Sequence, residues 1–315
     1  MSSYPLVSIC IPVYNGAEFI ESLLNTIRQT TYPYIEIIIS DDNSQDESLN
    51  LLRASHLANS HIFTHSRYGL VPNWNYCISQ AKGKYIKFLF QDDTLEPDCI
   101  TKMVKMAEQD EKIGLVFSCR NLIYEQPIDI EFVTGMKDLH KHWSKIQFVQ
   151  SGITLLQDRN FFKPPYNKIG EPTNVLICRE VFERVGLFDP AFKQLADLEM
   201  WLRIMTYYKI GFIDERLASF RIHPNQATSH NLGENKIETL FEIYKVWLKI
   251  IRNKTYQSLP GDLRKKMRVE LVKILLIKGV KSVILLRWDQ GRKVRALLKE
   301  ALGSTPEPSG NEFPS

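Results

Sequence analysis

The chain has 315 residues, of which 44% are hydrophobic and 24% charged, with 15 Gly, 15 Pro and a formal net charge of +4. This composition is that of an ordinary folded protein, and it excludes disordered, collagen-like and disulfide-scaffold classes. At roughly 150 residues per domain, the length predicts one larger domain and a smaller one.

The cysteines and the N-terminal segment bear on where the protein works. The five cysteines are odd in number, widely spaced and free of any C-x-x-C pair, so they indicate neither a disulfide framework nor a thiolate zinc site. The apolar run from Leu6 to Val13 is short, broken by Ser8 and Pro12, and has no basic stretch before it, so we do not expect a signal peptide. No segment has the roughly 18 uninterrupted apolar residues of a membrane span. We expect a cytoplasmic protein, peripheral at most on the inner membrane face.

Charge is unevenly distributed along the chain. Residues 236–302 carry 17 Lys or Arg against 6 Asp or Glu, whereas the rest of the chain carries 23 against 30. The change follows His230-Asn-Leu-Gly233, a loop-like segment. We therefore predict a first domain over 1–230, a basic region of amphipathic helices over 231–302, and a disordered tail over 303–315, where Pro, Ser and Gly are frequent.

Short β-branched runs alternate with helical patterns through the first domain. Phe19, Leu23 and Ile27, for example, share one face of a helix. The alternation predicts an α/β fold with a mixed, mostly parallel sheet covered by helices. The predicted strands are 6–13, 35–40, 61–64, 85–90, 114–118, 174–178 and 211–214, and the predicted helices are 17–29, 46–58, 72–80, 98–108 and 180–185.

Polar residues follow three of these predicted strands. Tyr14-Asn15-Gly16 follows the first strand, Asp41-Asp42-Asn43-Ser44 the second, and Gln91-Asp92-Asp93 the strand that begins at Tyr85. Ligands of open α/β sheets bind beyond the carboxyl ends of the strands. We therefore expect the three clusters to meet at one edge of the sheet and to form a ligand site.

Asp92 and Asp93 follow a nearly pure hydrophobic strand, so their carboxylates repel one another at close range. A divalent cation relieves such repulsion, and hard oxygen ligands suit Mg²⁺ or Mn²⁺, with Mg²⁺ in particular also binding substrate phosphates. The alternative is a loop in which an Asp caps the following helix. The pair alone does not decide between a metal site and a cap.

The cluster Asp41–Ser44 also has two interpretations. It can be a turn in which Asp46 caps the next helix. A carboxylate there can also accept the imide N–H of a uracil or thymine ring, while Tyr14 offers an aromatic face for the base. Neither a G-x-G-x-x-G fingerprint nor a G-x-x-x-x-G-K-[ST] loop is present, so a nucleotide would have its diphosphate held by a metal ion.

Four segments in a fixed order carry a resemblance. They are Val7-Ser-Ile-Cys-Ile-Pro-Val-Tyr-Asn15, Ile39-Ser-Asp-Asp-Asn-Ser44, Gln91-Asp-Asp93 and Ala196-Asp-Leu-Glu-Met-Trp-Leu-Arg203. Together they resemble the motifs of family 2 glycosyltransferases of the GT-A fold. The resemblance covers residues 4 to 228 and implies a Rossmann-like domain that binds a nucleoside-diphosphate sugar, with Mn²⁺ or Mg²⁺ as cofactor.

The resemblance implies roles for single residues on the donor side. Tyr14 and Asp42 would contact the nucleotide base, and the donor-binding set includes Pro12, Asn15, Asp41, Asn75, Asp92 and Arg221. Asp92 and Asp93 match the D-x-D motif that binds the ribose and the metal. Arg221 and His223 match an R-x-H segment that closes over the diphosphate, and His223 is a further candidate metal ligand.

The resemblance also implies a general base, since Asp197 matches the Asp of the family's ED motif. Without the resemblance, Asp197 would be read first as a helix cap. Two neighbours on the same predicted helix receive other interpretations. We expect Glu199 at the surface or on the acceptor side, and Trp201 in the core.

Three positions depart from the family's pattern. Phe90 stands where a D-x-D-D run has its first acid, and Ala196 stands where the ED motif has Glu. The Arg of the A-R-N segment is replaced within Asn73-Trp-Asn75. These departures motivate an alternative from another class, a catalytically silent homologue that binds a nucleotide sugar or docks to partner enzymes.

The leading hypothesis is an inverting hexosyltransferase that uses a UDP- or dTDP-sugar in polysaccharide or glycolipid assembly. An acceptor hydroxyl, deprotonated by Asp197, would attack the anomeric carbon as the nucleoside diphosphate leaves from the opposite face. The irregular stretch 128–168, with aromatic residues such as Trp143 and Phe161, is the candidate site for a saccharide or lipid-linked acceptor. Its histidines, His140 and His142, lack the i, i+4 spacing of a zinc site and receive no role.

The basic helical region has two interpretations as well. Lys and Arg interleave with apolar residues from Val269 to Trp288. Such helices either pack on the first domain with solvated basic faces, or contact an anionic bilayer surface peripherally. Nucleic-acid binding is disfavoured, because no nucleic-acid-binding module accompanies the charge.

Overall fold

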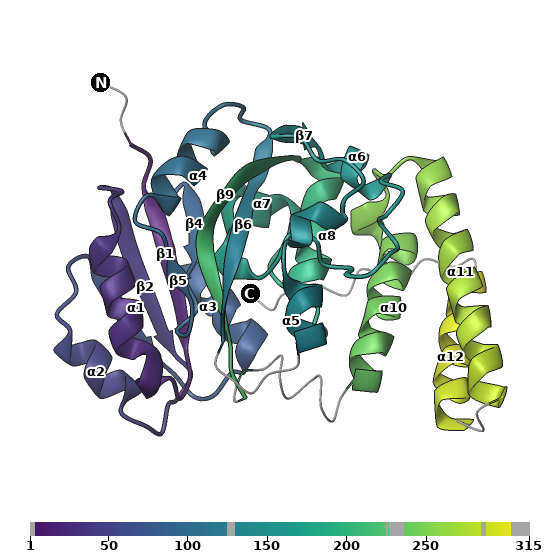
Figure 1. Ribbon diagram of the computed structural model, residues 1–315, viewed down its shortest axis with the longest axis horizontal. Coiled ribbons are helices and arrows are strands. Elements are labelled where there is room, and N and C mark those ends of the chain that lie inside the picture. The colour runs from purple at the N-terminus through teal and green to yellow at the C-terminus, as the bar shows by residue number, and fades with distance from the viewer. Residues whose placement is uncertain (1–3, 125–129, 225, 227–235, 285–287, 304–315) are drawn as a thin grey trace. The chain divides into compact units, whose positions relative to one another are not determined.

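The computed structural model describes residues 4–124, 130–224, 226, 236–284 and 288–303 (Figure 1). The chain divides into two compact units, Met1–Ser229 and His230–Ser315. The tail predicted from residue 303 onward lies, beyond Gly303, outside the described residues.

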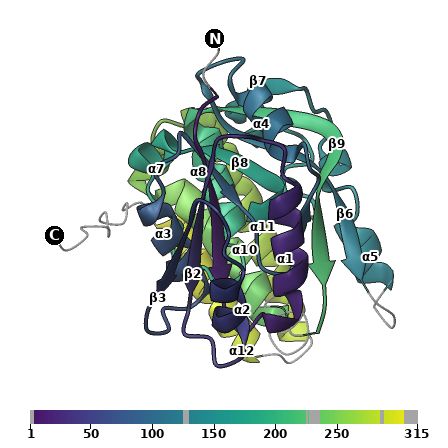
Figure 2. The ribbon, with the colours of Figure 1, turned by 90° about the vertical axis from the view of Figure 1, so that its left-hand side faces the viewer.

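The first unit opens with a run of parallel strands joined by helices. The four strands stand in the order β3-β2-β1-β4, and each pairs with its neighbour in parallel. Figure 2 shows α1 on one side of these strands and α3 on the other, as right-handed crossovers require when the strand order reverses at β1. The elements are β1 (Val7–Val13), α1 (Ala17–Gln29), β2 (Ile35–Asp41), α2 (Ser48–Ala54), β3 (Ser60–Thr64), α3 (Leu70–Gln80) and β4 (Tyr85–Phe88).

The sheet then continues as a mixed one. Strand β8 is antiparallel to both β4 and β6, while β6 and β9 are parallel, so the full order is β3-β2-β1-β4-β8-β6-β9-β5, with β7 also on β9. The elements are β5 (Thr94–Leu95), α4 (Cys99–Ala107), β6 (Ile113–Tyr124), α5 (Ile130–Met136), η1 (Leu139–His142), β7 (Val149–Ser151), α6 (Gly152–Leu156), η2 (Pro172–Asn174), β8 (Val175–Cys178), α7 (Glu180–Val185), α8 (Ala196–Tyr207) and β9 (Lys209–Ile222).

The predicted α/β class with a mixed, mostly parallel sheet is confirmed. Helices 17–29 and 180–185 have the predicted bounds, but α2 is shorter than the helix predicted over 46–58. Strands β6 and β9 continue well beyond the predicted 114–118 and 211–214, because they pair with one another to Tyr124 and Ile222. The short strands β5 and β7 both pair with β9. No local sequence pattern predicts either of them.

The core lies around β1, which is covered on both faces. Every residue from Val7 to Val13 is buried, and Ile9 and Ile11 are fully so. Leu23 and Ile27 on α1 pack into the same cluster, as their helical spacing predicts. A strand buried on both faces reads as a continuous apolar run and is held rigidly, which gives the residues at its carboxyl end a firm support.

Helix α8 is anchored by a buried ion pair. Arg203 Nη2 lies 2.7 Å from Glu199 Oε2, and the side chains are 5% and 0% exposed. The guanidinium also donates to the carbonyl oxygens of Val185 and Leu187. The expectation that Glu199 lies at the surface or on the acceptor side is therefore wrong. Its carboxylate is buried because it forms an ion pair with Arg203, one helical turn away. Trp201 is 1% exposed, as expected.

Removing one partner of this pair is expected to be costly. Glu199→Ala leaves the Arg203 charge buried without its counter-ion, so we expect the free energy of unfolding to fall by about 3–5 kcal/mol. Urea unfolding followed by circular dichroism measures the change. The matched control is Glu183→Ala on α7, since its 3.9 Å pair with Arg179 is exposed and should contribute about 0–1 kcal/mol. Equal effects in both variants would contradict the assignment.

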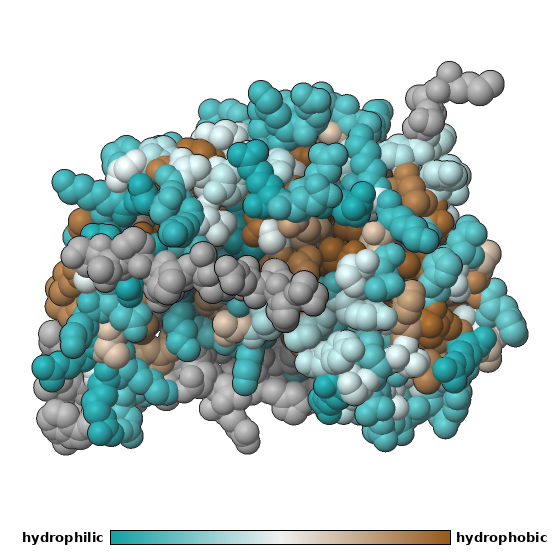
Figure 3. All heavy atoms as spheres, turned by 180° about the vertical axis from the view of Figure 1, so that it is seen from behind, coloured by the Kyte–Doolittle hydropathy of each residue, from teal (hydrophilic) through white to brown (hydrophobic). Residues whose placement is uncertain are grey.

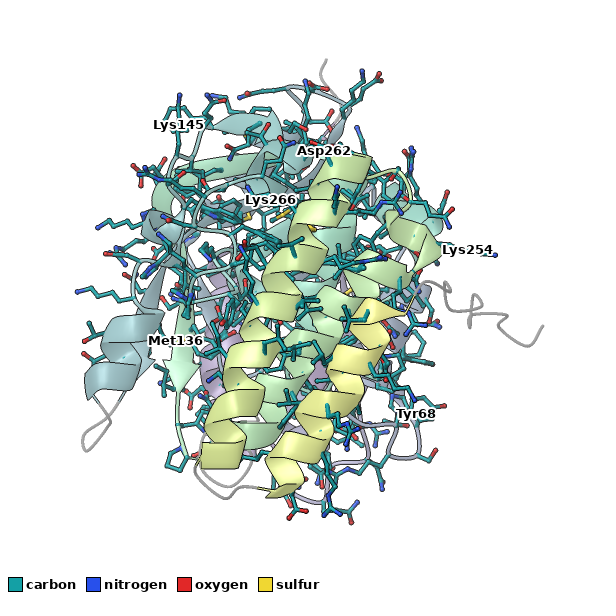
Figure 4. The ribbon with its side chains drawn as sticks, turned by 90° about the vertical axis from the view of Figure 1, so that its right-hand side faces the viewer. Tyr68, Met136, Lys145, Lys254, Asp262 and Lys266 are labelled. Atoms are coloured by element: carbon teal, nitrogen blue, oxygen red, sulfur yellow. The ribbon has the colours of Figure 1, made fainter. Side chains whose placement is uncertain are left out.

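The second unit contains α10 (Lys236–Arg252), η3 (Lys254–Tyr256), α11 (Gly261–Ile284) and α12 (Trp288–Leu302). Helix α11 packs on both α10 and α12, and its Leu271 and Leu275 are fully buried. Figure 4 shows Asp262 and Lys266 on the first turns of α11. None of the described helices has the length and apolar character needed to cross a membrane.

Candidate active site

The carboxyl ends of β1, β2 and β4 lie side by side, as predicted. Val13 is the register partner of Asp41, and Cys10 is that of Phe88, so the three strands present their following loops at one edge (Figure 1). The side chain of Gln91 joins two of these loops, because its amide accepts from the Tyr14 N–H and donates to the Tyr14 carbonyl oxygen. The polar clusters after the strands therefore form one connected rim.

The loop after β1 is also tied to the loop after β2. The Asn15 N–H donates to Ser44 Oγ at 3.0 Å, and Asn15 Oδ1 accepts from the Gln45 N–H at 2.8 Å. Asp46 accepts from the Ala17 N–H, at the start of α1. Asn15 has a φ of 46°, a left-handed conformation that Asn tolerates better than most residues. Asn15 thus shapes the loop with its own side chain.

Asp41 and Asp42 are buried at 1% and 3% exposure. Asp42 accepts from the backbone N–H groups of Tyr68 and Gly69, so its carboxylate holds the loop that leads into α3. Asp41 Oδ2 accepts from the Ser44 N–H, while its Oδ1 is buried without a hydrogen-bond partner among the described residues. Both acids lie at the predicted edge and accept from backbone N–H groups, and His65 Nδ1 also lies 3.6 Å from Asp42 Oδ1.

Tyr14 is stacked by a residue that the sequence did not single out. The guanidinium carbon of Arg67 lies 3.8 Å from the centroid of the Tyr14 ring, and Arg67 also donates a hydrogen bond to the Tyr14 hydroxyl. A planar cation on an aromatic face is a favourable arrangement. A base that stacked on this face of Tyr14 would have to displace Arg67 or stack upon it.

Asp92 meets the end of β9. His223 Nε2 lies 3.0 Å from Asp92 Oδ2, and Arg221 Nε donates to the Asp92 carbonyl oxygen at 2.9 Å. The imidazole packs on Phe19 of α1, with ring centroids 4.7 Å apart. Residues 129 to 131 positions apart in the chain are thus brought together, as the resemblance implied for the D-x-D and R-x-H segments.

Asp93 points into the protein, at 1% exposure. Its Oδ1 accepts from the Arg221 N–H at 3.0 Å. Burial and the neighbouring charge of Asp92 raise the pKa of Asp93 well above its usual range, and hydrogen bonds from Thr173 and Arg221 offset this only in part. A nearby cation would offset the repulsion between the two carboxylates and stabilise their charged forms.

The residues at this edge fit a divalent cation. Asp92 offers a partly exposed carboxylate, and His223 offers a ring nitrogen 3.0 Å from it, a spacing that neighbouring ligands of one ion adopt. Carboxylate and phosphate oxygens suit Mn²⁺ or Mg²⁺, and an imidazole ligand favours the transition metal Mn²⁺ over Mg²⁺. Asp92 and His223 would hold such an ion directly, and Asp93 would support it from beneath.

Asp197 lies in the first turn of α8. Its Oδ1 accepts from the Leu198 N–H at 2.6 Å, and its Oδ2 accepts from Asn167 Nδ2 at 2.8 Å. Burial raises the pKa of Asp197 to about 7, the nearby Glu171 charge adds to this, and the two hydrogen bonds act against it. A carboxyl group with a pKa near neutrality is suited to accept a proton.

Glu171 interacts electrostatically with Asp93 of the candidate metal pair and with Asp197, the candidate base. Its carboxylate receives two hydrogen bonds from Arg120, at 2.7 and 2.9 Å, in a bidentate pair. From this position its charge acts on both Asp93 and Asp197. The charge of Glu171 therefore acts on both the candidate base and the candidate metal pair, and the sequence had singled out neither Glu171 nor Arg120.

Asn167 orients Asp197, and its removal has an expected signature. In Asn167→Ala the carboxylate loses a donor that stabilises its charged form, so the pKa of Asp197 should rise further above its present value of about 7. A carboxyl NMR titration measures the midpoint. Asn160→Ala is the matched control, because Asn160 lies on the same segment but donates to the His142 carbonyl oxygen. A midpoint unchanged by Asn167→Ala would contradict this role.

Not every predicted residue faces this site. Asn75 donates to the Phe188 carbonyl oxygen and accepts from the Phe188 N–H, so its amide is taken up by the backbone. Pro12 is a buried residue of β1, paired with Ser40. In the candidate acceptor stretch, Trp143 and Phe161 are 7% and 3% exposed. The idea that these two rings stack on an acceptor is therefore wrong, because they fill the core beneath the stretch.

Two of the three departures from the family's pattern meet in space. The rings of Trp74 and Phe90 stack with centroids 5.1 Å apart, and Trp74 also packs edge-on against Phe188. Ala196 is 1% exposed at the start of α8. Apolar rings therefore stand where the family's motifs have charged side chains. The motif residues Asp92, Asp93, Asp197 and His223 are retained.

The residues that sequence reasoning missed are Arg67, Arg120, Asn167 and Glu171. Gln91 belonged to a predicted polar cluster, although its role in joining two loops was not foreseen. The four missed residues lie in loops or on a strand, and their contacts span 30 to 53 residues, so no local pattern marks them.

Comparison with known proteins agrees with this architecture. The model of glycosyl transferase family 2 matches residues 8–186. An uncharacterized protein of Mycobacterium tuberculosis is 29% identical over 215 residues, which are 68% of this chain and 66% of that protein, so the chain spans just under two thirds of that relative. An uncharacterized glycosyltransferase of Rickettsia typhi is 28% identical over 82% of this chain and 76% of its own length.

Solved structures show the same fold. Residues 1–349 of TarS from S. aureus, in complex with UDP-GlcNAc, align with a TM-score of 0.58 and 13% identity over 94% of this chain and 91% of that chain. The mannosyltransferase PcManGT from Pyrobaculum calidifontis, in complex with GDP-Man and Mn²⁺, aligns with a TM-score of 0.57 and 16% identity over 95% and 86%. These likenesses confirm the GT-A fold that the resemblance implied. Since the family model covers more than half of its length, the chain belongs to glycosyl transferase family 2.

Proposed function

We propose that the chain is an inverting, metal-dependent hexosyltransferase that moves a sugar from a UDP- or dTDP-sugar to an acceptor hydroxyl. The observation that carries the proposal is that one carboxylate, Glu171, acts electrostatically on both Asp197 and Asp93, while His223 contacts the adjacent Asp92. Residues 1–230 form the transferase domain in this proposal. TarS bound to UDP-GlcNAc and PcManGT bound to GDP-Man and Mn²⁺ support a nucleotide sugar as the donor class.

The carboxylates of Asp197 and Asp92 have separate roles in the proposed reaction. Asp197, held by Asn167 and the Leu198 N–H, removes the proton from the acceptor hydroxyl as the oxygen attacks the anomeric carbon. The bond to the diphosphate oxygen breaks on the opposite face, so the anomeric configuration inverts. A divalent ion at Asp92 and His223, when bound, supplies Lewis-acid stabilisation of the leaving diphosphate. Arg221, which contacts Asp92 and Asp93, adds positive charge beside it.

The donor base would lie at the Tyr14 and Asp42 end of the rim. Tyr14 with Arg67 offers a stacking surface, Asn15 shapes the neighbouring loop, and Asp41 ends β2 beside it, while Pro12 would act only through the backbone of β1. Asp42 already accepts two backbone N–H groups, so it can meet an imide N–H only with its remaining lone pairs. Asn75 is bound by Phe188 and would contribute through the position of α3.

The acceptor would enter beside Asn167, a residue of the candidate acceptor stretch that donates to Asp197. Lys168 fastens this segment, since its ammonium donates to the Lys163 and Pro165 carbonyl oxygens at 2.7 Å. A saccharide or a lipid-linked sugar is the acceptor class that we propose, in polysaccharide or glycolipid assembly.

A donor screen tests the proposal. UDP-, dTDP- and GDP-sugars, each with and without Mn²⁺ or Mg²⁺, are compared by thermal shift, and the preferred donor is then offered to a panel of sugar and lipid-linked acceptors. We expect stabilisation that depends on the metal, and a product of inverted configuration by NMR. The silent-homologue alternative, favoured by the Trp74–Phe90 stack, predicts binding without transfer or hydrolysis. Product of retained configuration would contradict the single displacement.

A peripheral membrane contact is proposed for the second unit. On α11, the exposed residues Val269, Leu276 and Ile277 alternate with exposed Lys266 and Lys273, a pattern that suits an anionic bilayer surface. Elsewhere, hydrophilic residues cover most of the face shown in Figure 3, with hydrophobic residues in separate groups. Flotation with anionic liposomes compares the full chain with a truncation after Gly233. Equal flotation of the two would remove this proposal.

A further inference from the structure

Three side chains outside the candidate active site converge on one point of the first unit. Cys119 comes from β6, His140 from the turn η1 and Asp214 from β9. Cys119 Sγ lies 3.4 Å from His140 Nδ1, 3.6 Å from His140 Nε2 and 3.4 Å from Asp214 Oδ1. One ligand atom from each residue lies within 4.8 Å of the other two.

An irregularity in the pairing of β6 with β9 creates this arrangement. Ser118 is the register partner of Ile213, but Cys119 is the partner of Arg216, so Asp214 and Glu215 lie in a bulge of β9. The bulge turns the Asp214 carboxylate toward the thiol instead of into the regular pleat. Bulges that re-aim a side chain in this way are frequent beside functional sites.

The three donors match the ligand set of a zinc-like ion. Thiolate, imidazole and carboxylate are all ligands of Zn²⁺, at about 2.3 Å for sulfur and about 2.0–2.2 Å for nitrogen and oxygen. These bond lengths place neighbouring ligands of a tetrahedron roughly 3.3 to 3.6 Å apart. The observed separations from the sulfur fall in or near this range. The sulfur is almost equidistant from both ring nitrogens of His140, so the ring has to turn on its stacking partner Phe212 until one nitrogen points at the ion.

Within the described part of the chain, the bases near these donors already have another partner. Lys141 and Arg216 are the nearby bases, and both pair with Asp138, at 2.9 and 2.8 Å. Burial lowers the pKa of His140, so its ring is neutral and available as a ligand near pH 7. Burial and the Asp214 charge raise the pKa of Cys119 to about 12, so the thiol is inert until a metal replaces its proton.

We propose that Cys119, His140 and Asp214 bind one Zn²⁺-class transition-metal ion, with a water molecule as the fourth ligand. The ion joins β6, β9 and the η1 turn, and so fastens the segment that follows α5 onto the sheet. It is distinct from the ion proposed at Asp92 and His223, because a thiolate selects softer metals than Mg²⁺. The proposal does not depend on the donor, the acceptor or the reaction.

Cobalt substitution tests the site in the full-length, untagged protein without nucleotide. Co²⁺ bound to a thiolate gives a charge-transfer absorption that ligation by oxygen and nitrogen alone does not give. We expect one such ion per chain, displacement by Zn²⁺, and release of about one proton per ion as Cys119 loses its hydrogen. At free Zn²⁺ one hundred times its Kd, we expect Tm to rise by roughly 5 °C.

Variants separate this site from adventitious binding. Cys119→Ser is expected to abolish the charge-transfer band, and Cys178→Ser, which alters a cysteine outside the cluster, is expected to keep it. Asp214 is exposed, so Asp214→Asn should fold normally and weaken Co²⁺ binding by about 10-fold or more. A band that survives Cys119→Ser, or an affinity unchanged in Asp214→Asn, would overturn the proposal. So would a folded wild-type protein that shows no band with excess Co²⁺.

Discussion

Replacing Asp197 with Asn is expected to lower kcat by about 10²- to 10⁴-fold while the donor still binds. The amide keeps the size of the side chain and can still meet Asn167 and the Leu198 N–H, but it cannot accept the proton of the acceptor hydroxyl. Steady-state transfer rates measure kcat, and thermal shift with the nucleotide sugar measures donor binding. The control is Glu180→Gln, an exposed acid on α7, which should leave both unchanged.

The pH dependence of the wild-type protein follows from the same residue. Asp197 has a pKa of about 7, so it is protonated and inactive as a base at lower pH and becomes charged as the pH rises through this value. The transfer rate should therefore rise with pH and level off above neutrality. Asp197→Asn should lack this rise. A rate in the variant that matches the wild type at every pH would exclude Asp197 as the base.

Asp92→Asn is expected to lower kcat/KM by about 10³-fold and to remove most of the dependence on Mn²⁺. Lewis-acid stabilisation of a leaving group contributes several kcal/mol, and each 1.36 kcal/mol corresponds to a factor of about ten. The variant keeps the backbone contact of Arg221 with the residue 92 carbonyl but loses the carboxylate that faces His223. Initial rates over a Mn²⁺ titration measure the effect.

The matched control for Asp92→Asn is Asp98→Asn. Asp98 is a nearby acid in the chain whose side chain is 49% exposed and pairs with Lys102 on the surface, so its loss should change kcat/KM by less than about twofold. Calorimetric titration with the nucleoside diphosphate should show tighter binding with Mn²⁺ in the control but not in Asp92→Asn. If both variants bind the nucleotide with the same metal dependence as the wild type, the ion is held elsewhere.

Local patterns in the sequence were enough to predict the rim of the site. The strands β1, β2 and β4 are mostly apolar, and a polar cluster follows each of them within a few residues, which parallel strands bring to one edge. These patterns predict Asp41, Asp42, Asp92 and Asp93 at that edge. The family resemblance then implied Asp197, Arg221 and His223, which no periodicity could have connected to the rim.

Other positions depend on contacts between segments that are far apart in the chain, and local patterns did not predict them. Glu199 was predicted at the surface because no local pattern indicates that Arg203 is buried. The buried ion pair between the two residues makes that prediction wrong. Asn75 looked like a donor contact, yet the Phe188 backbone occupies its amide. His140 lacked a zinc-like spacing in the chain, and only the bulge in β9 brings Asp214 and Cys119 to it.

The sequence by itself determined the class of the fold, the strands of the sheet that carry the site, and the acids at their ends, since apolar runs and helical spacing act over a few residues. The tertiary structure alone decided what each acid faces: Arg221 and His223 beside Asp92 and Asp93, Asn167 beside Asp197, and Glu171 acting on both sides. The reason is that burial and electrostatic interactions depend on distance in space, and in this chain the decisive partners stand 30 to 131 residues apart.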